Sequence, residues 1–203
     1  MSALAAAGLL LTAGLAAAPS ASAATGTRSL AAYLTAGGNG TFDSNGKDYD
    51  IVTQAVLAVL KAKPDSAVKV LTDGTTAATA FLPTDNAFRI LVKDLTGKSP
   101  KSEKDVFAAV LKLGVPTVET VLLYHVIPGK TLGAVKVIKS LGSSFTTAQG
   151  GSFQTYLVAD ILPIGLKDKD PNARDAHVKV VNLNYGNKQI AHGVDRVLRP
   201  LDL

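Results

Sequence analysis

Apolar residues recur every three or four positions through the N-terminal part of the chain, which is the spacing of one buried helix face. Ile51, Ala55, Val56 and Val59 show this spacing most clearly, and Pro64 ends the run. The pattern predicts one apolar strand at residues 79–82. It also predicts five helices, at residues 28–34, 51–60, 85–95, 102–113 and 117–126.

Residues that favour helix ends flank these segments. Asp, Ser and Thr side chains accept hydrogen bonds from the first free amides of a helix, and Gly adopts the left-handed conformation that often follows one. We expect N-terminal caps from Asp48, from Thr84 or Asp85, from Ser102 and from Thr117.

The pattern changes after residue 131, where short β-type runs replace the helical spacing. The runs cover residues 152–162, 177–183 and 189–198, and the polar stretch 167–174 separates the first two. Helices that precede strands in this way are typical of an α+β domain. The sequence therefore predicts one α+β domain with helices contributed mainly by its N-terminal half.

Residues 1–23 differ from the rest of the chain because they contain no Asp, Glu, Lys or Arg. An apolar run over 3–18 is followed by Ala21-Ser22-Ala23, a small-residue site typical of signal-peptide cleavage. A membrane anchor is the alternative, but spanning takes about 20 apolar residues and this run is shorter. We predict a secretory signal peptide at 1–23 and a single domain at 24–203, with its core from about 28 to 203. The mature protein is then expected outside the cell, free or associated with the wall, without a transmembrane anchor.

The composition is that of a globular domain, with 47% hydrophobic and 18% charged residues and no Cys to form a disulfide. The formal net charge is +5, and the first 23 residues carry none of it. A basic surface outside the cell favours anionic partners such as wall polymers or acidic polysaccharides, although solubility alone explains the charge equally well. The candidate contacts to an anionic surface form two groups in the sequence: Lys98, Lys101 and Lys104, and Lys130, Lys136 and Lys139.

Motifs for catalysis and for bound cofactors are missing. The chain has no Cys, no Gly-x-Ser-x-Gly elbow and no His-x-x-His spacing, so neither a nucleophilic hydrolase nor a zinc site is indicated. His125 shares a helix face with Val118 and Val121, and His192 shares a strand face with Ile190 and Val194. We therefore expect both imidazoles in the core, where each needs a hydrogen-bond partner.

One segment comes close to a calcium-binding loop. Residues 168–172, Asp-Lys-Asp-Pro-Asn, alternate oxygen ligands as an EF-hand loop does, but Ala173 stands where Gly is needed and Lys179 where the bidentate Glu belongs. We interpret the segment as a solvated hairpin loop. Aromatic residues make up 5% of the chain and the Lys residues are scattered, so nucleic-acid binding is not indicated either. We expect no metal and no cofactor.

Three segments together resemble the fasciclin domain family. Residues 79–88 (Thr-Ala-Phe-Leu-Pro-Thr-Asp-Asn-Ala-Phe) resemble its first signature, and 123–129 (Leu-Tyr-His-Val-Ile-Pro-Gly) its central Tyr-His signature. Residues 190–200 (Ile-Ala-His-Gly-Val-Asp-Arg-Val-Leu-Arg-Pro) resemble the last one. Their order and separations fit one whole domain, and the chain is most similar to secreted single-domain bacterial members of actinobacterial type.

The resemblance implies a fasciclin-like fold, a compact sandwich or wedge of two small sheets with a group of helices. It also implies adhesion or ligand binding outside the cell, without catalysis. The positions that match the signatures are expected to specify the fold: Thr84, Asp85, Phe88, Tyr124, His125, His192, Asp195, Arg196 and Pro200.

Three functions remain open from the sequence. The first is a secreted adhesion module that binds an unidentified extracellular protein or polymer. The second is a carrier of a small apolar ligand in a cleft between helices and sheet, which would need a cavity of a few hundred Å³. The third is a hydrolase, which would need a Ser or Asp within hydrogen-bond reach of a His at a pocket mouth.

Overall fold

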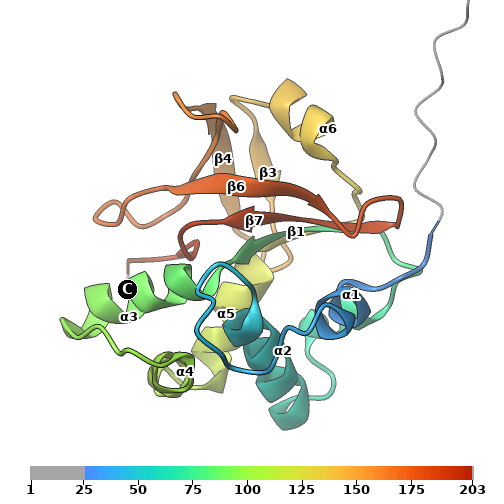
Figure 1. Cartoon of the computed structure of the whole chain (residues 1–203). Coiled ribbons are helices and arrows are strands. Elements are labelled where there is room, and N and C mark those ends of the chain that lie inside the picture. The colour runs from blue at the N-terminus through green and yellow to red at the C-terminus, as the bar shows by residue number, and fades with distance from the viewer. Residues whose placement is uncertain (1–25, 203) are drawn as a thin grey trace, which may run out of the picture.

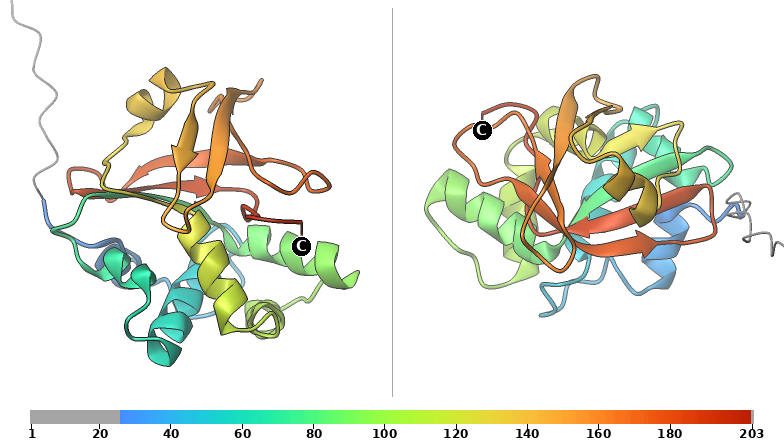
Figure 2. Two further views of the ribbon diagram at one scale, coloured as in Figure 1. Left: turned by 180° about the vertical axis from the view of Figure 1, so that it is seen from behind. Right: turned by 90° about the horizontal axis from the view of Figure 1, so that it is seen from above.

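The computed structural model describes residues 26–202, so the predicted signal peptide at 1–23 lies outside the described residues. Helices α1 to α5 pack against one face of the part of the sheet formed by β1, β6 and β7. Helix α6 and the strands β3 and β4 lie on its other side (Figures 1 and 2). The helical group comes almost entirely from the first 124 residues, as predicted. Its elements are α1 (Leu30–Ala36), α2 (Asp50–Ala62), the 3-10 helix η1 (Ala67–Thr72), α3 (Asp85–Thr96), α4 (Glu103–Leu111) and α5 (Val115–Tyr124).

Two of the predicted N-terminal caps are confirmed. The hydroxyl of Thr84 accepts a hydrogen bond from the amide of Ala87 at 3.3 Å and so caps α3. The hydroxyl of Ser102 accepts one from the amide of Asp105 at 3.1 Å and caps α4. Gly97 follows α3 with φ +68°, a left-handed conformation that suits Gly.

The other two predicted caps are wrong. Asp48 does not cap α2; the cap position is Tyr49, and the carboxylate that serves the first amides comes from Asp85, 34 residues further on. Thr117 lies inside α5, which begins two residues earlier, after Gly114. A Pro in the first turn of α5 has φ fixed for a helix and no amide to satisfy, so this end needs no side-chain cap.

The strands form one continuous seven-stranded order, β2-β1-β7-β6-β5-β4-β3, in which β1 and β7 are parallel and the other pairs antiparallel. The two predicted sheets are parts of this order, because β5 pairs with β6 through Gly165–His177 and Leu166–Ala176. The strand bounds are β1 (Ala78–Pro83), β2 (Val126–Pro128), β3 (Ser144–Thr146), β4 (Ser152–Leu157), β5 (Ile164–Lys167), β6 (Ala176–Leu183) and β7 (Gln189–Val194). The α+β class is confirmed.

Short elements were missed by the sequence analysis. The run predicted at 152–162 is β4 followed by a turn, and β5 begins only at Ile164. The three-residue strands β2 and β3 and the helix α6 (Ala134–Lys139) are too short to produce a recognisable period.

Two hydrophobic cores lie on opposite faces of the β1–β7 pair. The larger core packs the helices against the sheet and includes Ile51, Val59 and Phe88. The smaller core lies between the two parts of the folded strand order and includes Phe81 and Phe153. All six residues of β1 and all six of β7 are buried, because both faces of this central pair are covered.

Candidate functional site

The ring of His125 connects two distant parts of the chain. His125 follows the last residue of α5, and its Nδ1 donates to the carbonyl of Val121 at 2.7 Å. Its Nε2 accepts from the backbone amide of Leu198 at 2.9 Å, across 73 residues. A ring that donates at Nδ1 and accepts at Nε2 is neutral, and burial lowers the pKa of His125 to about 4. Both nitrogens are therefore committed to the fold.

His192 and Tyr124 are also buried and bound to backbone. His192 lies in β7, contacts the carbonyl of Leu132 through Nε2 at 2.8 Å, and stacks on Phe81 with ring centroids 5.4 Å apart. The hydroxyl of Tyr124 donates to the carbonyl of Ser152 at 2.7 Å. Burial lowers the pKa of His192 and raises that of Tyr124. These partners hold strands and loops together.

The remaining signature positions have similar surroundings. Phe88 is buried in the helical core, as predicted. Asp195 accepts a hydrogen bond from the backbone amide of His177 at 2.8 Å, and Arg196 donates to the backbone carbonyl of Asp195 at 3.0 Å. Pro200 is half-buried in the segment that follows β7. The signature residues thus join helices, strands and this final segment.

The segment at 168–172 lies in the hairpin loop between β5 and β6, as predicted, but it is only partly solvated. Asp170 is buried and forms an ion pair with Arg199 at 3.0 Å, and Arg199 also pairs with Asp94 of α3 at 2.6 Å. Asp168 accepts from the backbone amide of Arg199 at 2.8 Å. The carboxylates that suggested a calcium loop are instead bound to Arg199.

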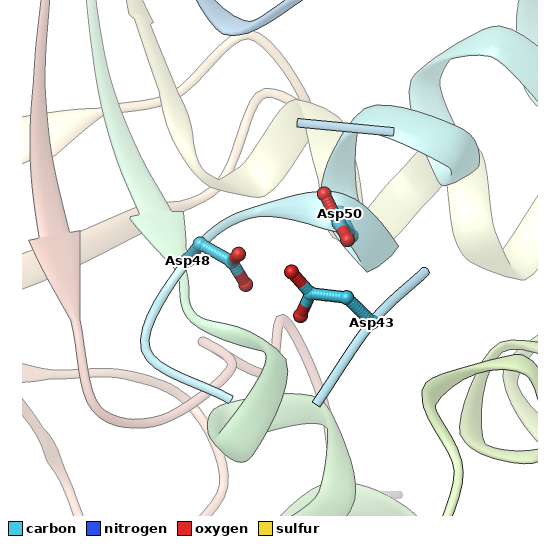
Figure 3. A group of neighbouring side chains, drawn as sticks. All are labelled: Asp43, Asp48 and Asp50. Carbon is cyan, nitrogen blue, oxygen red and sulfur yellow. The ribbon is translucent and has the colours of Figure 1, made fainter. Parts of the chain in front are cut away.

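A different set of carboxylates converges where the sequence analysis did not look. Asp43, Asp48 and Asp50 point toward one another between the loop that follows α1 and the start of α2 (Figure 3). In a second group, Asp48 lies with Asp85 and Glu103, and within each group one oxygen of every residue lies within 4.8 Å of the others. The signal for this cluster was the acidic start of three successive helices, although sequence alone gave no sign that these ends meet.

Most of the cluster is hidden from water. Asp50, Asp85 and Glu103 are each at most 1% exposed. Burial raises the pKa of Asp50 and Glu103, and burial together with the adjacent carboxylate of Asp48 raises that of Asp85 well above its usual range. These oxygens are the hard ligands that Ca²⁺ and Mg²⁺ take in proteins.

The candidate Lys residues are all exposed, and they form two separate groups. Lys98 and Lys101 lie between α3 and α4 and Lys104 is in the first turn of α4, whereas Lys136 and Lys139 belong to α6 on the other side of the sheet (Figure 1). No ion pair joins any of the six candidate Lys side chains to a carboxylate within residues 26–202. All six charges therefore remain available to an external partner.

Hollows in the described part of the molecule are small or open. An apolar cavity between α1, α2 and β1 has a volume of about 20 Å³ and is lined by residues that include Leu30, Val56 and Leu82. Open depressions of about 510 and 410 Å³ border the loop before β6, and charged side chains of both signs line them. Among residues 26–202 no single helix is long and apolar enough to cross a membrane; α4 and α5 reach that length only as a pair bent by 106°.

This geometry defines an α+β domain in which His125, His192 and Tyr124 are buried and hydrogen-bonded to backbone groups. A model of the fasciclin domain matches residues 52–200, and the chain belongs to the fasciclin domain family. Its structure is similar to that of a FAS1 domain pair from the insect cell adhesion molecule fasciclin I, with a TM-score of 0.51 and 15% identity. The match covers 73% of this chain and 46% of the insect chain, so this chain spans less than half of that domain pair. A comparison with curated proteins finds no match.

Proposed function

We propose that the protein is a secreted, non-enzymatic adhesion module that binds an anionic polymer outside the cell. Membership of the fasciclin domain family supports an adhesion-type role. The observation that carries the anionic partner is a surface around α6 that combines Lys side chains with exposed apolar ones. We call it the α6 surface and define it by Lys130, Val135, Lys136, Ile138 and Lys139.

The α6 surface is positive without local compensation. Residues 120–159, which include α6, β3 and β4, contain no Asp or Glu. The ammonium group of Lys136 reaches back to the carbonyl of Thr131 at 3.2 Å, so it lies beside the segment that carries Lys130. Val135 is 65% exposed and Ile138 40% exposed between these Lys residues. Such a surface offers both charge and apolar contact to an acidic polysaccharide.

The second Lys group has a different environment. Lys101 and Lys104 share the start of α4 with the exposed carboxylate of Asp105, and Asp94 lies exposed on the preceding helix. Nearby carboxylates weaken the field of this group. For this reason we assign binding to the α6 surface and not to the net charge as a whole.

The proposal that the protein is not an enzyme is supported by the hydrogen bonds of the two core imidazoles. His125 is hydrogen-bonded to the backbone of Val121 and Leu198, and His192 to the backbone of Leu132. Among residues 26–202, neither ring is paired with the Ser or Asp side chain that a hydrolase would use. The carrier role has less support, because the apolar cavity between helices and sheet holds about 20 Å³, roughly the space of one water molecule.

The test is retention of the purified full-length chain on alginate, a polyanion, and on neutral dextran at rising salt. The Debye length falls from about 10 Å at 0.1 M to about 3 Å at 1 M salt, so binding through exposed Lys side chains should be lost over that range. Replacing Lys130, Lys136 and Lys139 by Gln should abolish retention on alginate. Equal retention on both polymers, or retention unaffected by salt, would rule out an anionic partner.

The matched control replaces Lys98, Lys101 and Lys104 by Gln. It lowers the formal net charge of +5 by three, as the first variant does, and leaves the α6 surface intact. We expect this variant to stay on alginate almost as well as the parent. If both variants lose retention equally, net charge and not the α6 surface is responsible.

Secretion has its own test. Cleavage after Ala23 would give a mature chain that begins at Ala24. Sequencing the N-terminus of protein from the culture medium should find that residue. Recovery in membranes alone, with Met1 retained, would contradict the secreted part of the proposal.

A further inference from the structure

The acidic cluster has more negative charge than the described residues neutralise. It consists of Asp43, Asp48, Asp50, Asp85 and Glu103, arranged as two groups that share Asp48. No ion pair joins any of these carboxylates to a Lys or Arg within the described part of the chain. The helices α2, α3 and α4 begin here, and each N-terminus supplies roughly half a positive charge. Three such ends offset only part of the charge that these carboxylates carry when they are ionised.

Two oxygens of the cluster have no hydrogen-bond donor among residues 26–202. Glu103 is 1% exposed; its Oε2 accepts from the amide of Asp43 at 2.8 Å, but its Oε1 has no hydrogen-bond partner. Asp48 Oδ1 is also buried without a partner, while its Oδ2 accepts from Asn45 at 3.0 Å. A buried carboxylate oxygen without a donor is costly, and both lie in the group formed by Asp48, Asp85 and Glu103. The helix N-termini therefore leave these two oxygens free for a ligand.

The spacing of the oxygens suits a bound cation. Ca²⁺ takes six to eight oxygen ligands at about 2.3–2.6 Å, so oxygens around one ion lie no more than roughly 5 Å apart. In each group, the chosen oxygens lie within 4.8 Å of one another. The exposed Asp43 and the half-buried Asp48 leave the outer side of the cluster in contact with solvent, which gives an ion a way in.

We propose that this cluster is a binding site for one Ca²⁺ ion, with Asp48 and Glu103 as central ligands and Asp43, Asp50 and Asp85 around them. Ca²⁺ fits better than Mg²⁺ because the ligands come from a loop and three helix ends, and Ca²⁺ tolerates irregular geometry whereas Mg²⁺ requires a near-ideal octahedron. The ion would hold the loop of residues 37–49 against the starts of α2, α3 and α4. The site lies among the helices and is separate from the α6 surface (Figure 1).

The experiment is thermal unfolding of the full-length chain in EDTA and in about 10 mM CaCl₂ at matched ionic strength. For the millimolar to submillimolar affinities of extracellular calcium modules, we expect Tm to rise by about 3–10 °C. Titration calorimetry should give one Ca²⁺ per chain. MgCl₂ at the same concentration should produce a smaller rise.

Two neutral variants locate the site. Glu103→Gln and Asp48→Asn keep the side-chain shape and remove one ligand charge, so each should melt in EDTA at or above the parent Tm and lose the rise with calcium. Asp43→Asn, an exposed position that tolerates substitution, should weaken calcium binding about tenfold. The control is Asp65→Asn, a fully exposed carboxylate outside the cluster, which should keep the full rise.

Three results would overturn the proposal. One is an unchanged Tm in calcium together with stabilisation of Glu103→Gln and Asp48→Asn, which would mean that the carboxylates share a proton and hold no cation. Another is an equal rise with magnesium, which would exclude calcium as the preferred ion. The third is an unaltered calcium response in Glu103→Gln and Asp48→Asn, which would place the ion elsewhere.

Discussion

At the scale of single residues, each of the two core imidazoles is hydrogen-bonded to a backbone group that lies far away in the sequence. His125→Ala removes the acceptor of the Leu198 amide, and His192→Ala removes the partner of the Leu132 carbonyl. An unsatisfied buried group costs about 1–3 kcal/mol, and we expect each variant to lose that much stability in thermal or urea unfolding. His177→Ala, at a half-buried position, is the control and should change stability less. Unchanged unfolding in the two core variants, together with lost ligand binding, would assign these residues to function.

The protonation state of His125 makes its contribution depend on pH. Its pKa is about 4 in the fold and 6.5 when unfolded, so between these values the unfolded chain binds the additional proton. The stability that His125 provides is therefore fully present above pH 6.5 and decreases as pH falls toward 4, by about 3 kcal/mol in total.

The measurement compares urea unfolding of the parent chain and of His125→Gln from pH 7 to pH 4. The difference between the two removes the contributions of the acidic groups, whose raised pKa values act in the opposite direction. We expect the advantage of the parent to shrink as pH falls. A difference that is constant across this range would show that the pKa of His125 is the same in the folded and the unfolded chain.

At the scale of elements, Asp85 stabilises a helix to which it does not belong. Its two carboxylate oxygens accept from the amides of Ile51 at 2.8 Å and Asp50 at 3.2 Å, at the start of α2, although Asp85 is the first residue of α3. Asp85→Ala should therefore cost about 1–3 kcal/mol. Hydrogen exchange should show faster exchange of the Asp50 and Ile51 amides.

Thr84→Ala is the matched control for this prediction. Thr84 caps α3 itself, so its loss should cost about 0.5–2 kcal/mol and expose the amide of Ala87. The amides at the start of α2 should keep their protection in this variant. If Asp85→Ala leaves the Asp50 and Ile51 amides protected, the cap between the two helices does not contribute to α2.

Local signals predicted the elements that are long and regular, and failed where the partner is remote. The period of α2, the Thr84 cap and Gly97 are readable because each depends on residues within one or two turns. Asp48 has the right chemistry for a cap, but the first amides of α2 bind the carboxylate of Asp85, which lies 34 residues beyond Ile51. The α+β class, the helical group and the core positions of His125 and His192 were predictable. The convergence of the acidic side chains was not, because it depends on how three helices pack.

At the scale of the whole molecule, Arg199 joins three parts of the fold. It pairs with Asp170, whose side chain is 1% exposed, and with Asp94 on α3, whose side chain is 43% exposed. Removing one partner of a buried ion pair costs about 3–5 kcal/mol, whereas an exposed pair contributes about 0–1 kcal/mol. Asp170→Asn should thus destabilise the protein far more than Asp94→Asn in urea unfolding.

A double-mutant cycle with Arg199→Met isolates the buried pair. The combined Arg199→Met and Asp170→Asn variant should lose less stability than the sum of the two single changes, because neither charge is then left alone. Additive losses would mean that Arg199 and Asp170 act independently. The exposed partner Asp94 provides the comparison within the same cycle design.

The parallel pairing of β1 with β7 has a consequence for how the chain is made. Residues 84–188 separate these strands, so at 5–20 residues per second the ribosome takes roughly 5–20 s to deliver β7 after β1. During that interval the apolar β1 has an open edge, which is the kind of surface that pairs with foreign strands. We expect the nascent chain to need protection by a chaperone for these seconds.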